Sequence, residues 1–176
     1  NHGADKLTCC VAQGTCGDAG VSSGDCGDGF IPKPNSSTSK CIGSVCDIVD
    51  TGADKLTCCV AQATCGNAKG AFRAADGIGV SNSDCGAGFI ANPDAIASKC
   101  VGVVCDVANV PADKTACCVA QATCGDVNGG VIGPNAVTDG DCGDGFIVKP
   151  NSSTLKCVGG SCDEANEVAD KTTCCV

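Results

Sequence analysis

The chain has 176 residues, of which 20 are cysteine, 25 are glycine and only four are aromatic, and its net charge is −9. Cysteine at this frequency marks a disulfide scaffold, whereas large apolar residues are too few to order the chain by hydrophobic burial alone. We therefore expect cross-links to supply the missing stability. The acidic balance and the shortage of aromatic residues argue against nucleic-acid binding, and no apolar run is long enough to span a membrane.

The cysteines recur in three groups of six, followed by a final pair. Within each group the steps are 1, 6, a variable step, 15 and 5 residues, and only the variable step changes, from 10 to 20 to 18. Insertions are thus confined to one loop per repeat, as in arrays of surface-looped units. This spacing predicts repeat 1 at residues 4–52, repeat 2 at 53–111, repeat 3 at 112–168 and the start of a fourth repeat at 169–176.

The first segment of each repeat has the form Ala-Asp-Lys-x-x-Cys-Cys-Val-Ala-Gln-x-Thr-Cys-Gly, as at residues 53–66. We expect a helix of about two to three turns, capped by Asp54 and ended at Gly66. In such a helix Cys58 and Cys65, seven residues apart, lie on one face. The lysine that recurs in this motif is expected in a structural ion pair or on the helix surface.

Two further segments recur in every repeat. Asp-Cys-Gly-x-Gly-Phe-Ile, as at residues 25–31, predicts a tight turn followed by a short strand. Its phenylalanine is the large aromatic that recurs, so we expect it to anchor the core of each repeat. Lys-Cys-Ile-Gly-x-x-Cys-Asp, as at residues 40–47, predicts a short extended piece with a glycine kink. The expected fold class is a small disulfide-rich protein of tandem units, elongated and mostly irregular, with short helices and short β pieces.

All the cysteines are expected to form disulfides, because an even number in a small-residue chain favours an oxidising compartment. Adjacent cysteines rarely bond each other, since the ring would distort the peptide between them, so each pair should send its sulfurs to different partners. Six cysteines still allow 15 connectivities, and the spacing does not choose among them. The candidate disulfide cysteines are Cys9, Cys10, Cys16, Cys26, Cys41, Cys46, Cys58, Cys59, Cys65, Cys85, Cys100, Cys105, Cys117, Cys118, Cys124, Cys142, Cys157, Cys162, Cys174 and Cys175.

A metal-thiolate protein is the competing interpretation of the cysteines. It would use Cys-x-x-Cys or Cys-x-Cys pairs, and neither pattern occurs. The single histidine, His2, is near the start of the sequence, which leaves no partner for a Cys–His zinc site. Redox catalysis would also require Cys-x-x-Cys. We therefore expect no cofactor and no metal bound through sulfur.

The final pair, Cys174 and Cys175, opens a repeat whose remainder is not in the sequence. Two explanations stay open. Either the structural unit is out of phase with the repeats above, so that each Cys-Cys helix closes the unit before it, or the chain is a window of a longer array. Under both, we expect at least one disulfide to join neighbouring repeats and to make a stiff rod.

Two kinds of surface site are candidates. Asn35 and Asn151 begin Asn-Ser-Ser glycosylation sequons at equivalent positions of repeats 1 and 3. Asp139, Asp141 and Asp144 cluster hard oxygen ligands of the kind that calcium prefers. This cluster lacks the glutamate that completes an EF-hand loop, so ordinary turn and cap roles for aspartate are the competing explanation.

The motif Cys-Cys-Val-Ala-Gln-Ala-Thr-Cys-Gly, followed by Asp-Cys-Gly-x-Gly-Phe-Ile and Lys-Cys-Val-Gly-x-x-Cys-Asp, resembles the cysteine-rich tandem repeats of large secreted or surface proteins in unicellular algae and other protists. The resemblance covers nearly the whole chain. It implies an extracellular location and a modular construction, and it carries no assigned activity.

These patterns favour a non-enzymatic, structural role, because with His2 as the single histidine no Ser-His or Cys-His arrangement is available. We expect a glycosylated building block of an extracellular filament, flagellar hair or surface coat. Its partners would be further copies, neighbouring repeats of a longer chain and glycans. The alternative is a secreted or lumenal accessory module, including one of the thylakoid lumen, that contacts a ligand or larger complex through variable loops at residues 68–83 and 127–140.

Overall fold

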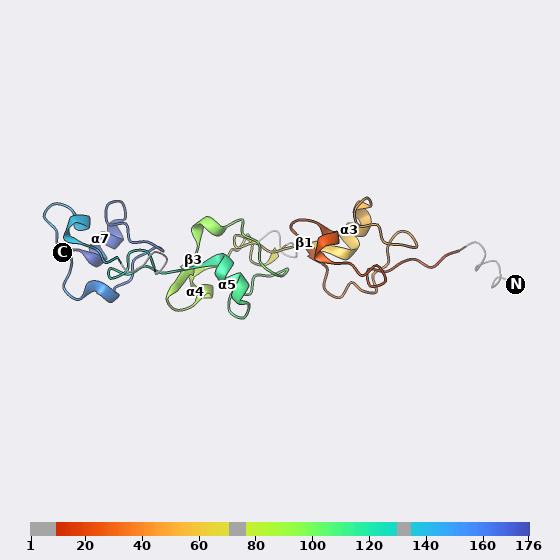
Figure 1. Ribbon diagram of the computed structural model, residues 1–176, viewed down its shortest axis with the longest axis horizontal. Coiled ribbons are helices and arrows are strands. Elements are labelled where there is room, and N and C mark those ends of the chain that lie inside the picture. The colour runs from red at the N-terminus through yellow and green to blue at the C-terminus, as the bar shows by residue number, and fades with distance from the viewer. Residues whose placement is uncertain (1–9, 71–76, 130–134) are drawn as a thin grey trace.

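The computed structural model describes residues 10–70, 77–129 and 135–176, and it shows a disulfide-rich fold of short helices and short strands joined by irregular chain (Figure 1). This part of the expected fold class is confirmed. In chain order the elements are α2 (Ser23–Cys26), β1 (Phe30–Pro32), α3 (Gly52–Cys58), β2 (Cys59–Ala61), α4 (Asn82–Cys85), β3 (Phe89–Ala91), the 3-10 helix η2 (Pro93–Ala95), α5 (Pro111–Cys117), β4 (Cys118–Ala120), α6 (Asp139–Cys142), the 3-10 helix η3 (Ser152–Thr154) and α7 (Val168–Cys174).

The predicted Phe-Ile strands are present as β1 and β3. Strand β1 pairs antiparallel with β2, with Phe30 opposite Ala61 and Ile31 opposite Val60. Strand β3 pairs with β4 in the same register. Further along the chain this ladder is reduced to a bridge between Val148 and Cys175. Each pairing joins the residues after an Asp-Cys-Gly turn to the residues after a Cys-Cys helix.

The helix expected over residues 53–66 is shorter than predicted. Helix α3 ends at Cys58, and Cys59 already belongs to β2. Of the helix-favouring residues that follow, Ala61 is held extended by pairing with β1, and Gln62 and Ala63 lie in irregular chain after β2. Asp54 is also not the cap: Thr51 holds the N-cap position, and Asp54 lies in the first turn, where it is buried. Tertiary pairing has overridden local propensity here.

Sulfur and small apolar side chains form the core. Three separate buried clusters are made mostly of cysteine, with alanine, valine and isoleucine filling the remaining space. The recurring phenylalanine is not the anchor that the sequence suggested, since Phe89 is 38% exposed and Phe146 is 45% exposed. Its ring instead lies under the lysine of the following Cys-Cys helix, as for Lys114 over Phe89 at 4.1 Å. This cation–π contact suits a half-exposed aromatic residue.

The three clusters follow one another in chain order. Figure 1 is drawn with the longest axis horizontal, and the colour passes along that axis from red through green to blue. Each cluster therefore draws its residues from one continuous stretch of sequence rather than from distant parts of the chain.

Candidate functional site: three disulfide cages and the junctions between them

Nine disulfides among the described residues repeat one pairing scheme three times, and each set of three disulfides is called a cage below. In the first cage, Cys16 bonds Cys58, Cys26 bonds Cys59, and Cys41 bonds Cys46. Adjacent cysteines thus send their sulfurs to different partners. The other two cages are Cys65–Cys117, Cys85–Cys118 and Cys100–Cys105, then Cys124–Cys174, Cys142–Cys175 and Cys157–Cys162.

The cages are out of phase with the repeats expected from the sequence. They span residues 16–59, 65–118 and 124–175. Each of the adjacent pairs Cys58–Cys59, Cys117–Cys118 and Cys174–Cys175 therefore closes the cage that precedes it. In the frame of the sequence repeats, two of the three bonds in each cage cross a boundary. In the frame of the cages, none of the nine disulfides joins one cage to the next.

Cys10 is a correction to the expected disulfides, because among the described residues it is exposed and unpaired. Its equivalents, Cys59 and Cys118, bond cysteines that come earlier in the chain, Cys26 and Cys85. Cys9, the other candidate of this pair, lies outside the described residues.

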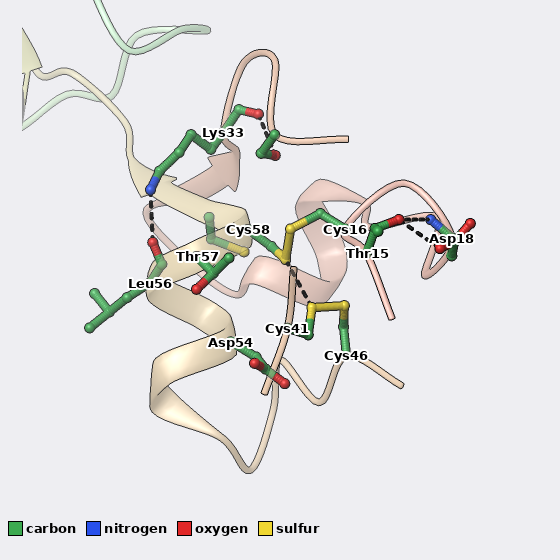
Figure 2. The surroundings of a disulfide bond; sticks show 12 residues. Thr15, Cys16, Asp18, Lys33, Cys41, Cys46, Asp54, Leu56, Thr57 and Cys58 are labelled. Carbon is green, nitrogen blue, oxygen red and sulfur yellow. Dashed lines mark hydrogen bonds between the residues drawn. A yellow bond between two sulfur atoms is a disulfide. The ribbon is translucent and has the colours of Figure 1, made fainter. Parts of the chain in front are cut away.

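Two disulfides of each cage are in contact. The Cys41 sulfur lies 3.7 Å from the Cys58 sulfur, so the bonds Cys16–Cys58 and Cys41–Cys46 pack side by side (Figure 2). The same contact recurs at 3.6 Å and 3.8 Å in the other cages. Three sulfurs per cage lie close enough together to hold a metal ion. All are already bonded to another sulfur, and a thiolate is the form that binds metal, so the oxidised cages offer no such site.

A buried carboxylate holds the smallest disulfide loop of each cage in place. Asp54 is 2% exposed, and its two oxygens accept hydrogen bonds from the backbone N–H groups of Ile42 (2.8 Å) and Asp47 (3.0 Å). Ile42 and Asp47 directly follow Cys41 and Cys46, the two cysteines that bond each other, and Asp54 lies next to that disulfide in Figure 2. Asp113 and Asp170 repeat the arrangement at the same spacing. The recurring Ala-Asp-Lys motif is therefore explained by a tie between helix and loop, a role that the sequence analysis missed.

The junction between cages is centred on one glutamine. The Gln62 backbone N–H donates to the Gly29 carbonyl of the first cage at 2.9 Å, while its side-chain amide donates to the Cys100 carbonyl of the second cage at 3.1 Å. Gln121 makes the equivalent bonds to Gly88 and Cys157. Each linker is thus hydrogen-bonded to the cages on both sides, which limits their relative motion.

The two candidate glycosylation sites lie on exposed turns. Asn35 and Asn151 are both exposed and adopt left-handed backbone conformations, with φ of 61° and 62°. The serine that follows each is buried, and the Ser36 hydroxyl donates to the Lys33 carbonyl at 2.7 Å. Each asparagine is therefore exposed on a turn whose next residue is a buried serine.

The three candidate calcium ligands lie in different environments. Asp141 accepts hydrogen bonds from the Thr138 hydroxyl and backbone N–H, and these bonds hold the pKa of its carboxyl below the usual range. Asp139 accepts from the Val148 N–H at 2.8 Å, and Asp144 is exposed. Among the described residues, these carboxylates are not gathered around a common point. Cap and turn roles account for Asp139 and Asp141.

The described part of the variable loop at 68–83 borders a groove on the second cage. An open hollow of about 680 Å³ lies between Ala68–Lys69, the segment 78–84 and the segment 104–108. Residues 71–76 and 130–134, which belong to the two candidate binding loops, lie outside the described residues.

Glu164 is a buried charge that sequence reasoning missed. It occupies the core position held by Ile48 and Val107 in the other cages, and it is 8% exposed with one carboxylate oxygen that has no hydrogen-bond partner among the described residues. Burial raises the pKa of its carboxyl, and so do the charges of Asp141, Asp170 and Asp163. Comparison of the three repeats would have revealed it as a glutamate at an otherwise apolar position.

We predict that Glu164 makes the third cage less stable as the pH rises. A raised folded-state pKa means that the folded chain binds the proton more tightly, so the protein is most stable below the ordinary glutamate pKa and loses this stability as the pH rises through the folded pKa. Glu164→Val should remove the dependence and raise the free energy of unfolding at neutral pH by about 1–2 kcal/mol. Hydrogen exchange of residues 135–176 at several pH values measures both effects. Val107→Glu should install the same pH dependence in the second cage, and equal pH profiles for E164V and the parent protein would refute the assignment.

None of the helices in the described parts of the chain has the length and apolar character needed to span a bilayer.

No protein-family model, curated protein or solved structure matches this chain.

Proposed function

We propose that the protein is a structural building block of an extracellular filament, flagellar hair or surface coat. The observation that carries the proposal is that one cage of three disulfides is built three times along the chain, with each linker hydrogen-bonded on both sides. Such an array is stabilised locally at every repeat, and its units are restrained at every junction. This combination suits a stiff, elongated structural element.

The chemistry of the cages supports an extracellular location. Disulfides in this number form and persist in oxidising compartments, and the exposed Asn35 and Asn151 turns are accessible to glycosylation. The buried polar groups with the clearest partners, Asp54, Asp113 and Asp170, are used to hold backbone. A non-catalytic role and the resemblance to algal and protist surface repeats are both part of the proposal.

The test is to locate the chain in native material. An antibody raised against the purified chain should label regular fibres or a surface layer in negative stain. On a non-reducing gel, the species that the antibody detects should migrate at a very high apparent mass. Glycosidase treatment should lower the mass of the chain, and Asn35→Gln with Asn151→Gln should abolish that change. Label confined to discrete particles in a membrane complex would overturn the structural role.

That last outcome would favour the second candidate, a secreted or lumenal accessory module. The groove bordered by the described part of the 68–83 loop is the observation behind it.

A further inference from the structure

The third cage holds a carboxylate beside its disulfide sulfurs. A carboxylate oxygen of Glu164 and the sulfurs of Cys162 and Cys174 all lie within 4.8 Å of one another. Cys162 is bonded to Cys157, and this bond closes the short loop of the cage. Cys174 is bonded to Cys124. Glu164 is therefore next to two of the three disulfides of its cage.

The other two cages have the same short loop without the carboxylate. The bonded cysteines of the short loop are 5 residues apart in all three cages, and Ile48 and Val107 occupy the position of Glu164. The buried cluster that contains Val107 is drawn from residues 63–118, so this position belongs to the interior of one cage. One chain thus offers the same disulfide loop with and without a neighbouring acidic group.

The Glu164 carboxylate lacks a hydrogen-bond donor. Its Oε1 atom is buried and has no partner among the described residues. The charged groups that act on it belong to Asp141, Asp163 and Asp170, and carboxylates accept hydrogen bonds rather than donate them. A disulfide sulfur has no hydrogen to donate, whereas a thiol S–H is a weak donor. Reduction of the neighbouring bond therefore supplies the donor that the oxidised cage lacks.

We propose that the Cys157–Cys162 bond is a site of thiol–disulfide exchange with small thiol reductants, and that Glu164 makes it the most readily reduced of the three short-loop disulfides. The unsatisfied buried acceptor destabilises the oxidised cage, and a hydrogen bond from the Cys162 thiol to Glu164 stabilises the reduced one. Both effects shift the exchange equilibrium toward the thiols. This reaction of the third cage does not depend on the proposed structural role.

The exchange begins at Cys162, because this residue is half-buried whereas Cys157 is 1% exposed. A thiolate of the reductant attacks the Cys162 sulfur, a new S–S bond forms there, and Cys157 leaves as a thiolate. A second thiol group of the reductant then attacks the sulfur that was added, which releases Cys162 and the reductant as its own disulfide. Two electrons pass from the reductant to the cage, and the two protons that its thiols lose end on Cys157 and Cys162.

The rest of the cage confines the reaction to the short loop. The other disulfide beside Glu164 is closed to attack, since Cys124 is 1% exposed and Cys174 is 0% exposed. The Asp170 carboxylate still accepts from the backbone N–H groups of Val158 at 2.7 Å and Asp163 at 3.0 Å. These bonds do not involve sulfur, so they hold the loop in place after the disulfide opens.

Equilibration of the oxidised protein in mixtures of reduced and oxidised dithiothreitol tests the proposal. Cys9→Ser and Cys10→Ser keep the first Cys-Cys pair out of the exchange. Free thiols are blocked with light N-ethylmaleimide, and the remaining disulfides are then reduced and blocked with the heavy reagent. Trypsin and an aspartate-specific protease release residues 41–46, 100–105 and 157–162 as three peptides of different mass, so one spectrum gives the reduced fraction of every short loop.

The equilibrium constant for reduction should be about tenfold larger for Cys157–Cys162 than for the other two short loops, the effect of one hydrogen bond to a buried charge. Glu164→Val should remove this difference. A third cage that is merely loosened by its buried charge would also lose the Cys124–Cys174 bond, whereas the proposal requires that bond to stay oxidised.

Val107→Glu is the matched variant in the second cage. It should make Cys100–Cys105 about tenfold easier to reduce while Cys65–Cys117 stays oxidised. If Cys65–Cys117 is reduced as well, the second cage has opened, and the comparison of Glu164→Val with the parent chain decides alone. Equal constants for the three short loops of the parent chain, short loops that resist every mixture, or a Glu164→Val variant that behaves as the parent does would each overturn the proposal.

Discussion

Replacing Cys65 and Cys117 together with alanine is expected to lower the stability of the second cage by about 4 kcal/mol. The two residues are 52 apart in sequence, and closing a loop of that length removes about this much conformational free energy from the unfolded chain in the entropy model. Because each cage has its own core, the loss should be local. Hydrogen exchange followed by mass spectrometry should show lost protection in residues 65–70 and 77–118, with residues 124–129 and 135–175 unchanged.

The matched control is the short loop of the same cage. Cys100 and Cys105 are 5 apart, so their replacement by alanine should cost only about 2 kcal/mol. Equal losses for the two double variants would show that loop closure is not the source of the stability. Loss of protection in all three cages at once would show that the cages do not fold independently.

Asp113→Asn should lower the free energy of unfolding more than any other single substitution of a charged residue in the second cage. Asp113 is 1% exposed, and its carboxylate accepts from the N–H groups of Val101 at 2.7 Å and Asp106 at 2.8 Å. An asparagine amide can accept only one of these bonds and turns an N–H₂ group toward the other donor. The expected loss is about 2–3 kcal/mol, the value of a charge-assisted bond together with an unsatisfied buried group.

Asp94→Asn is the control for Asp113→Asn. This substitution makes the same change of charge at an exposed residue of helix η2. Substitutions at such surface positions usually change the free energy of unfolding by no more than about 0.5 kcal/mol. Thermal unfolding followed by circular dichroism compares the two variants. A melting temperature for Asp113→Asn equal to that of Asp94→Asn would contradict the role of the tie between helix and loop.

The cysteine spacing in the sequence was enough to predict a disulfide-rich chain with short elements. Two of the three predicted Phe-Ile strands were found, as β1 and β3, whereas at Phe146 and Ile147 the pairing is reduced to the bridge between Val148 and Cys175. The spacing could not select the pairing, because contacts such as that of Cys16 with Cys58 depend on how the chain folds back from one repeat to the next. The helix over residues 53–66 was overestimated for the same reason, since pairing with β1 holds residues 59–61 extended.

Two further errors came from interpreting side chains by type alone. The recurring phenylalanine was assigned to the core because it is large and apolar. Sulfur fills the core instead: Phe30 packs only at the edge of the first cluster, with Lys55 over its ring at 4.4 Å, and Phe89 and Phe146 are exposed. Asp54 was assigned to the helix cap, although its partners are the N–H groups of a loop 7 and 12 residues earlier. Both contacts are nonlocal, and a single repeat gives no signal for them.

The central claim is that the pairs Cys58–Cys59, Cys117–Cys118 and Cys174–Cys175 each close the cage before them, and the disulfide map tests that claim most directly. Trypsin and an aspartate-specific protease, used without reduction, should release residues 41–46, 100–105 and 157–162 as separate peptides, each with its own internal disulfide. Residues 172–176 should remain joined to the peptides that carry Cys124 and Cys142. A bond between adjacent cysteines, or a disulfide joining Cys46 to a cysteine of another cage, would contradict the account.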